Sequence, residues 1–169
     1  MANRIHKLID VGHDDIILRT FILFVQTADT VLKYADTYFY RKSHLSVIKF
    51  MALRILAANG GTMTPSEIAE WTFRERNNIT TLINRLEQDG LVRAERNKRD
   101  KRFINVTLTT KGLKLLKQTI PVATEIINKV MLSVSEGDAI TLEKSLRVLR
   151  KNAHDSLEHL AKHVKPQSG

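Results

Sequence analysis

The chain has 169 residues, and its 27 Lys and Arg side chains outnumber its 18 Asp and Glu side chains, which gives a net charge of +9. Such a basic chain favours a polyanionic partner, either a nucleic acid or an acidic membrane surface. The sequence contains no cysteine. This excludes a disulfide framework, a thiolate zinc site and a cysteine-based redox sensor, and it fits a reducing cytoplasm.

The length suits one folding unit with an added oligomerisation element. The most apolar stretch, residues 16–28, is interrupted by Arg19 and followed by Asp29, so it is too short to cross a hydrocarbon layer of about 30 Å. The N-terminal residues lack the apolar run of a signal peptide. We therefore expect a soluble protein without a membrane span.

Apolar residues at alternating steps of four and three predict a first helix from about His13 to Tyr40. At about 1.5 Å per residue this helix is roughly 42 Å long, which exceeds a compact domain of this size. One face of the helix needs a partner surface, because it carries an apolar seam along its whole length. The seam comprises Ile17, Phe21, Phe24, Ala28, Val31, Ala35 and Tyr38.

Two capping boxes predict a pair of short helices in the middle of the chain. Residues 64–67 read Thr-Pro-Ser-Glu, the start of a helix from Pro65 to about Glu70. Residues 72–75 read Thr-Phe-Arg-Glu, with Thr72 as the cap of the next helix. The two helices must meet across a turn of about three residues, as they do in a helix-turn-helix.

The second of these helices is amphipathic and ends at Gly90, a favourable residue beyond a helix C-terminus. Its core face carries Ile79, Leu82, Ile83 and Leu86 at helical spacing. The opposite face has no acidic side chain at its centre, and its amide, hydroxyl and guanidinium groups suit base edges and phosphates. The candidate DNA contacts on this helix are Arg74, Asn77, Asn78, Thr80, Thr81, Asn84 and Arg85. The alternative is an exposed helix with no special use.

A β-hairpin is predicted next, with one strand over Leu91–Arg96 and its β-branched partner over Phe103–Thr109. Residues 93–102 hold six basic side chains against two acidic ones. The basic side chains at this hairpin tip repel one another unless they are solvated or lie against phosphates. A solvated loop is the usual case, but a position directly after a helix-turn-helix favours DNA. The candidate contacts here are Lys98, Arg99, Lys101 and Arg102.

The C-terminal part repeats the apolar seam of the first helix, and Ser135 with Asp138 marks a helix start. The seam comprises Leu142, Leu146, Leu149, Ala153, Leu157, Leu160 and Val164. The two long helices either pack on each other within one chain or interlock with a second chain. We favour a homodimer, because two-fold partners suit a protein that reads palindromic DNA.

The second of the paired helices ends in the run Leu86-Glu87-Gln88-Asp89-Gly90-Leu91-Val92. In the hairpin that follows, Asp100-Lys101-Arg102 precedes Val106-Thr107-Leu108-Thr109, and Lys111 and Gly112 then open the next helix. With these motifs, residues 45–150 resemble the MarR family, whose members show a Leu-Glu-x-x-Gly-Leu-Val run followed by a wing of this pattern.

The resemblance implies a mostly α fold with a small β-wing, in which a winged helix-turn-helix is flanked by N- and C-terminal dimerisation helices. One domain would span residues 1–169, with dimerisation helices at 13–42 and 113–164 around a DNA-binding lobe at 45–112. Recognition helices of a triangular dimer would enter successive major grooves, and wing arginines would enter the flanking minor grooves. Asp100 would orient the wing by pairing with a nearby arginine.

The resemblance further implies a sequence-specific, double-stranded DNA-binding transcriptional regulator of a bacterial or archaeal nucleoid. We expect a homodimeric repressor at a palindromic operator, relieved by a small aromatic ligand. Residues that could line the ligand cleft include Tyr34, Tyr38, Phe50 and Trp71. The alternative is an architectural DNA-binding protein that senses nothing.

Other classes of function find little support in the sequence. No nucleophile elbow, P-loop or dinucleotide fingerprint is present, so we expect no enzyme and no cofactor. His159 and His163 are four residues apart on the last predicted helix, with His154 nearby, but they do not complete a metal site.

Overall fold

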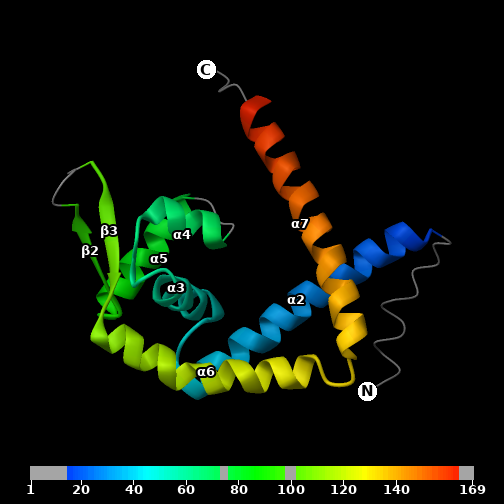
Figure 1. Ribbon diagram of the computed structural model, residues 1–169, viewed down its shortest axis with the longest axis horizontal. Coiled ribbons are helices and arrows are strands. Elements are labelled where there is room, and N and C mark those ends of the chain that lie inside the picture. The colour runs from blue at the N-terminus through cyan, green and yellow to red at the C-terminus, as the bar shows by residue number, and fades with distance from the viewer. Residues whose placement is uncertain (1–14, 73–75, 98–101, 164–169) are drawn as a thin grey trace. The chain divides into compact units, whose positions relative to one another are not determined.

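The computed structural model describes residues 15–72, 76–97 and 102–163. The chain divides into two compact units, residues 1–130 and 131–169, and the first contains the sheet and most of the helices (Figure 1). The elements of the first unit are α2 (Ile16–Ser43), α3 (Val47–Ala58), β1 (Thr62–Met63), α4 (Pro65–Thr72), α5 (Arg76–Gln88), β2 (Val92–Arg96), β3 (Ile104–Leu108) and α6 (Thr110–Val130). The second unit contains α7 (Glu136–His163). Helices with one small sheet confirm the predicted fold class.

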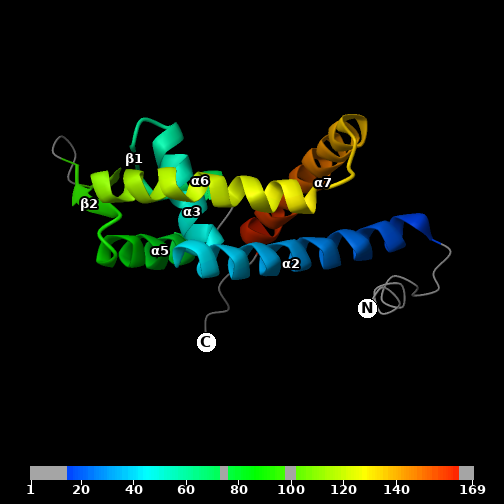
Figure 2. The ribbon, with the colours of Figure 1, turned by 90° about the horizontal axis from the view of Figure 1, so that it is seen from below.

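Helix α2 is long, as predicted, but both of its ends lie about three residues further along the chain than expected. The Asp15 side chain caps its start by accepting the backbone N–H groups of Ile17 and Leu18 at 2.8 and 3.3 Å. His44 ends it in the left-handed region, with φ of 53°, and donates its N–H to Tyr40 O. In Figure 2, α2 runs beside α6, against which it packs.

The core of the first unit lies where α3, α4, α5 and the sheet meet. Its fully buried side chains come from all of these elements and include Leu53, Leu56, Ile68, Ile79, Leu86 and Val106. The four apolar residues predicted for the core face of α5 are all buried. Burial of this stripe fixes which face of α5 points away from the protein.

The first predicted capping box is confirmed. The N–H of Glu67 donates to Thr64 Oγ1 at 3.3 Å, and the N–H of Thr64 donates to the Glu67 carboxylate at 2.6 Å. The Thr64 hydroxyl also donates to the Glu67 carboxylate at 2.9 Å. The two hydrogen bonds that this carboxylate accepts, first that from the Thr64 N–H and then that from the Thr64 hydroxyl, lower the pKa of Glu67.

The assignment of Thr72 was wrong, because it is the last residue of α4 rather than the cap of the next helix. Its hydroxyl donates to Ile68 O at 2.7 Å, which is how a threonine inside a helix usually bonds. Glu75, the other half of the predicted box, lies outside the described residues. Helix α4 therefore extends two residues past Glu70.

The sheet has three antiparallel strands in the order β1-β3-β2. Strands β2 and β3 form the predicted hairpin in a register that pairs Ala94 with Val106. Strand β1 was not predicted. Gly60 and Gly61 form a turn with positive φ, and Thr62 and Met63 then pair with β3.

Thr109 joins the hairpin to α6. Its N–H donates to Leu91 O at 3.1 Å, and its hydroxyl lies 2.8 Å from Gly90 O and accepts the N–H of Gly112 at 3.0 Å. A Cβ added at Gly112 would lie 2.1 Å from Leu91 O. The start of α6 thus packs directly on the backbone that enters the hairpin.

The second unit consists mainly of α7. Ser135 caps this helix as predicted, since its hydroxyl accepts the N–H of Asp138 at 3.1 Å. Throughout the described ranges, no helix combines the length and the apolarity that a membrane crossing requires.

Candidate nucleic-acid interface

Helix α5 presents a polar face opposite its buried stripe. The side chains described on this face are exposed and belong to Asn78, Thr80, Thr81, Asn84, Arg85 and Gln88. Asn77 lies in the first turn of α5, where the description covers its backbone alone, and Arg74 lies outside the described residues. Amides and hydroxyls at the centre, with Arg85 beside them, can bond base edges and phosphates.

Two acidic residues, Glu87 and Asp89, lie at the C-terminal end of α5. Glu87 Oε1 accepts the backbone N–H of Ala94 in β2 at 2.8 Å, and the Asp89 carboxylate pairs with Lys49 of α3 at 2.5 Å. Gly90, with φ of 68°, ends the helix as predicted. Both carboxylates are thus engaged with neighbouring elements, which lessens their repulsion of a DNA phosphate.

The hairpin of β2 and β3 carries exposed arginines along its length. Arg93 pairs with Glu95 on the same strand at 2.6 Å, and Arg96 and Arg102 are exposed near the tip. Lys98, Arg99, Asp100 and Lys101 lie outside the described residues, so the predicted pairing of Asp100 stays a prediction. A basic hairpin directly after an acid-free helix face suits a polyanion that extends across both elements.

The four aromatic residues predicted to line a ligand cleft lie in three different settings. Tyr34 and Tyr38 are neighbours on α2, with ring centroids 5.8 Å apart. Phe50 is buried in the core, with its ring 4.8 Å from that of Phe39. Trp71 is exposed in the last turn of α4.

Tyr38 belongs to a charged cluster between α2 and α6. Its hydroxyl donates to the Glu125 carboxylate and lies 3.4 Å from Lys129 Nζ. Lys129 Nζ also lies 4.7 Å from the centre of the Tyr38 ring, a cation–π contact, and Lys42 Nζ lies 5.7 Å from it. The hydrogen bond to Tyr38 raises the pKa of Lys129, which keeps its ammonium charged. None of these charged residues was among the site residues predicted from the sequence.

The model of the MarR family matches residues 45–102. The transcriptional regulator SarZ of Staphylococcus haemolyticus is 26% identical over 139 residues, which cover 82% of this chain and 91% of that protein. The transcriptional repressor YetL of Bacillus subtilis is 28% identical over 139 residues, which cover 82% of this chain and 80% of that protein.

Two solved structures share the fold. The MarR family regulator Sco3205 of Streptomyces coelicolor, in complex with DNA, superposes with a TM-score of 0.76 at 19% identity and covers 85% of this chain and 92% of its own. The organohalide-sensing regulator RdhR, bound to 2,4-dichlorophenol, superposes with a TM-score of 0.74 at 20% identity and covers 85% of this chain and 84% of its own.

Proposed function

Because this chain belongs to the MarR family of DNA-binding transcription regulators, we propose that it is a homodimeric repressor that reads a palindromic operator with α5. The exposed, acid-free face of α5 carries the proposal. It offers neutral donors and acceptors for base edges, and the basic hairpin offers cations for the adjacent backbone. In a two-fold dimer the half-sites would lie about 10 base pairs apart.

Repression is proposed from relatives such as YetL, which is itself a repressor. We place the protein on the nucleoid of a bacterial or archaeal cytoplasm. Selection of bound fragments from the source genome tests the proposal: a repressor should enrich one palindrome upstream of a gene whose transcript rises when the protein is deleted. Enrichment without sequence preference would instead indicate an architectural DNA-binding protein.

The apolar surface of α2 supports a dimer. Ile17 and Phe21 are 75% and 57% exposed, and the seam of α7 leaves Leu157 and Leu160 exposed as well. Contiguous apolar surface of this kind indicates a partner.

We expect light scattering to give about twice the 19.3 kDa of one chain, and truncation after Ser135 to give monomeric or insoluble protein. A full-length monomer at micromolar concentration would exclude the dimer.

The hairpin tip should bind phosphates without reading sequence. Each phosphate that a cation neutralises contributes about −0.9 to the slope of log affinity against log salt concentration. Replacement of both Lys98 and Lys101 by alanine should therefore flatten this slope by up to about 2 units while sequence preference stays the same. Binding titrations over a range of salt concentrations measure this slope, and an unchanged slope would show that the tip does not contact DNA.

We further propose that a small aromatic effector binds near Tyr34 and Tyr38. Their paired rings and the ammonium groups of Lys42 and Lys129 suit an aromatic compound with negative charge. RdhR, which shares the fold, binds a chlorinated phenol. A panel of phenols and benzoates should contain a compound that raises the melting temperature of the wild type but not of Tyr38→Ala. Equal shifts in both proteins would place the effector elsewhere.

A further inference from the structure

The C-terminal end of the reading helix carries acidic residues that its own stability does not favour. A helix C-terminus bears partial negative charge, so acidic groups there are unfavourable and basic groups favourable. Yet Glu87 lies in the last turn of α5 and Asp89 directly follows it. Each of the two residues contacts a different neighbouring element, and these contacts offset the unfavourable position of the two charges.

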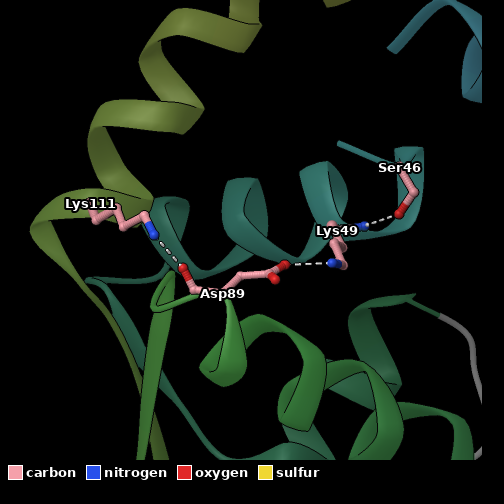
Figure 3. A network of polar contacts seen from close by, with 4 residues as sticks. All are labelled: Ser46, Lys49, Asp89 and Lys111. Atoms are coloured by element: carbon pink, nitrogen blue, oxygen red, sulfur yellow. Dashed lines mark hydrogen bonds and ion pairs between the residues drawn. The ribbon is translucent and has the colours of Figure 1, made fainter. Parts of the chain in front are cut away.

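Asp89 connects α5 to α3 (Figure 3). Its carboxylate lies 2.5 Å from Lys49 Nζ, and the Lys49 side chain is 22% exposed. Lys49 is the third residue of α3, whose N-terminus bears partial positive charge, so a lysine is unfavourable there too. Lys49 and Asp89 thus each oppose the dipole of the helix at whose end they lie, and their ion pair between α3 and α5 offsets both effects.

Lys111 connects the same end of α5 to α6. Its ammonium donates to the backbone carbonyl oxygen of Asp89 at 2.7 Å, as Figure 3 shows. Lys111 is the second residue of α6, where a cation again opposes the helix dipole. At the carbonyl end of α5 the same cation is favourable. The lysine therefore stabilises the junction between the two helices at the expense of its own helix.

Glu87 connects α5 to the wing. Just beyond the two ends of β3, the N–H of Thr109 donates to Leu91 O and the N–H of Asn97 donates to Phe103 O. Residues that bond to the partner strand alternate along an antiparallel strand, so the backbone N–H of Ala94 faces the outer edge of β2. Glu87 Oε1 accepts this N–H at 2.8 Å. The bond satisfies an edge donor and fixes the last turn of α5 against the strand that leads to the hairpin tip.

We propose that Lys49, Glu87, Asp89 and Lys111 are positioning residues for sequence reading. They hold the C-terminal end of α5 against α3, β2 and α6, so its exposed face meets the base edges in one orientation. Hydrogen bonds to bases weaken steeply with distance and angle, whereas flexible lysines follow phosphates through small displacements. A loosened helix therefore loses operator binding before it loses general DNA binding. The inference rests on the proposed function.

The test compares the affinities of variants for two DNA probes: the fragment most enriched from the source genome and a scrambled fragment of equal length. Asp89→Ala and Lys49→Ala should each lower the ratio of the two affinities about 3- to 30-fold. The matched controls are Glu143→Ala and Lys151→Ala, which remove the same charges from exposed ion pairs of α7. These controls should keep the ratio within about twofold of wild type.

A reversed pair separates positioning from loss of fold. The double variant Lys49→Asp with Asp89→Lys restores the ion pair with its charges exchanged, so it should regain most of the wild-type ratio, with thermal unfolding confirming a folded protein. If Asp89→Ala fails to fold, the reversed pair decides: a low ratio in a folded double variant overturns the proposal.

Different outcomes would overturn the proposed function and the positioning role. Wild-type protein that binds both probes equally would overturn the proposed function. Wild-type protein that prefers the enriched fragment, together with single variants that keep this preference, would overturn the positioning role alone.

Discussion

Replacement of Gly112 by alanine should destabilise the protein by about 3 kcal/mol or more, although alanine is the better helix former. A Cβ at this position would lie 2.1 Å from Leu91 O and 2.8 Å from a methyl carbon of Leu108. The carbonyl oxygen belongs to the backbone and cannot rotate away, so the start of α6 must move off the hairpin. Overpacking alone destabilises by about 1–3 kcal/mol, and the shift would also strain the bonds of Thr109 to both elements.

Gly137→Ala is the matched control, because Gly137 lies in the first turn of α7 as Gly112 lies in the first turn of α6. The nearest atom to a Cβ there is Ser135 Oγ, at 3.9 Å. Alanine should therefore stabilise by about 0.4–1 kcal/mol through the unfolded chain. Urea unfolding of both variants measures the difference. Equal effects of the two substitutions would show that α6 does not pack tightly on Leu91.

Local sequence signals predicted the part of the molecule in which spacing alone decides the structure. The apolar positions of α5 repeat with the helix period, so its buried stripe and its opposite, polar face followed directly. The Thr64 box and the Ser135 cap were also correct, because each bond joins residues three apart in the chain. The polar face of α5 depends on this same local geometry.

Contacts between elements could not be predicted in this way. Strand β1 has two residues and exists only because β3 lies beside it. The Thr-x-x-Glu pattern at Thr72 fits a helix start equally well, but its hydroxyl bonds back into α4. Lys49 and Lys111 nevertheless carry a signal in the sequence, because each lies in the first turn of a helix, where cations are disfavoured. Such a misplaced charge indicates a partner on another element.

Asn77→Ala and Thr81→Ala should each lower affinity for the operator by about 1–3 kcal/mol, or roughly 5- to 150-fold, with little change on random DNA. The two positions are one turn apart on the reading face of α5, and Thr81 is exposed. Neither side chain carries a charge, so neither adds to the general attraction between the protein and phosphates. Their loss should remove base recognition at two symmetric positions, one in each half-site.

Arg102→Ala is the contrasting variant, because this exposed residue at the base of the hairpin tip is a cation that can enter a narrow minor groove. It should weaken binding to operator and random DNA alike, with any loss of selectivity confined to the outer base pairs. Competition assays of each protein variant with operators that carry single-base changes distinguish a selective loss of operator affinity from a general loss of DNA affinity. If Asn77→Ala and Thr81→Ala lowered both affinities equally, α5 would serve as a backbone contact, and the sequence would have to be read by the hairpin or by DNA shape. The uncharged amides and hydroxyls at the centre of the α5 face argue for a selective loss of operator affinity, since a surface built only to hold phosphates gains most from lysine and arginine at its centre.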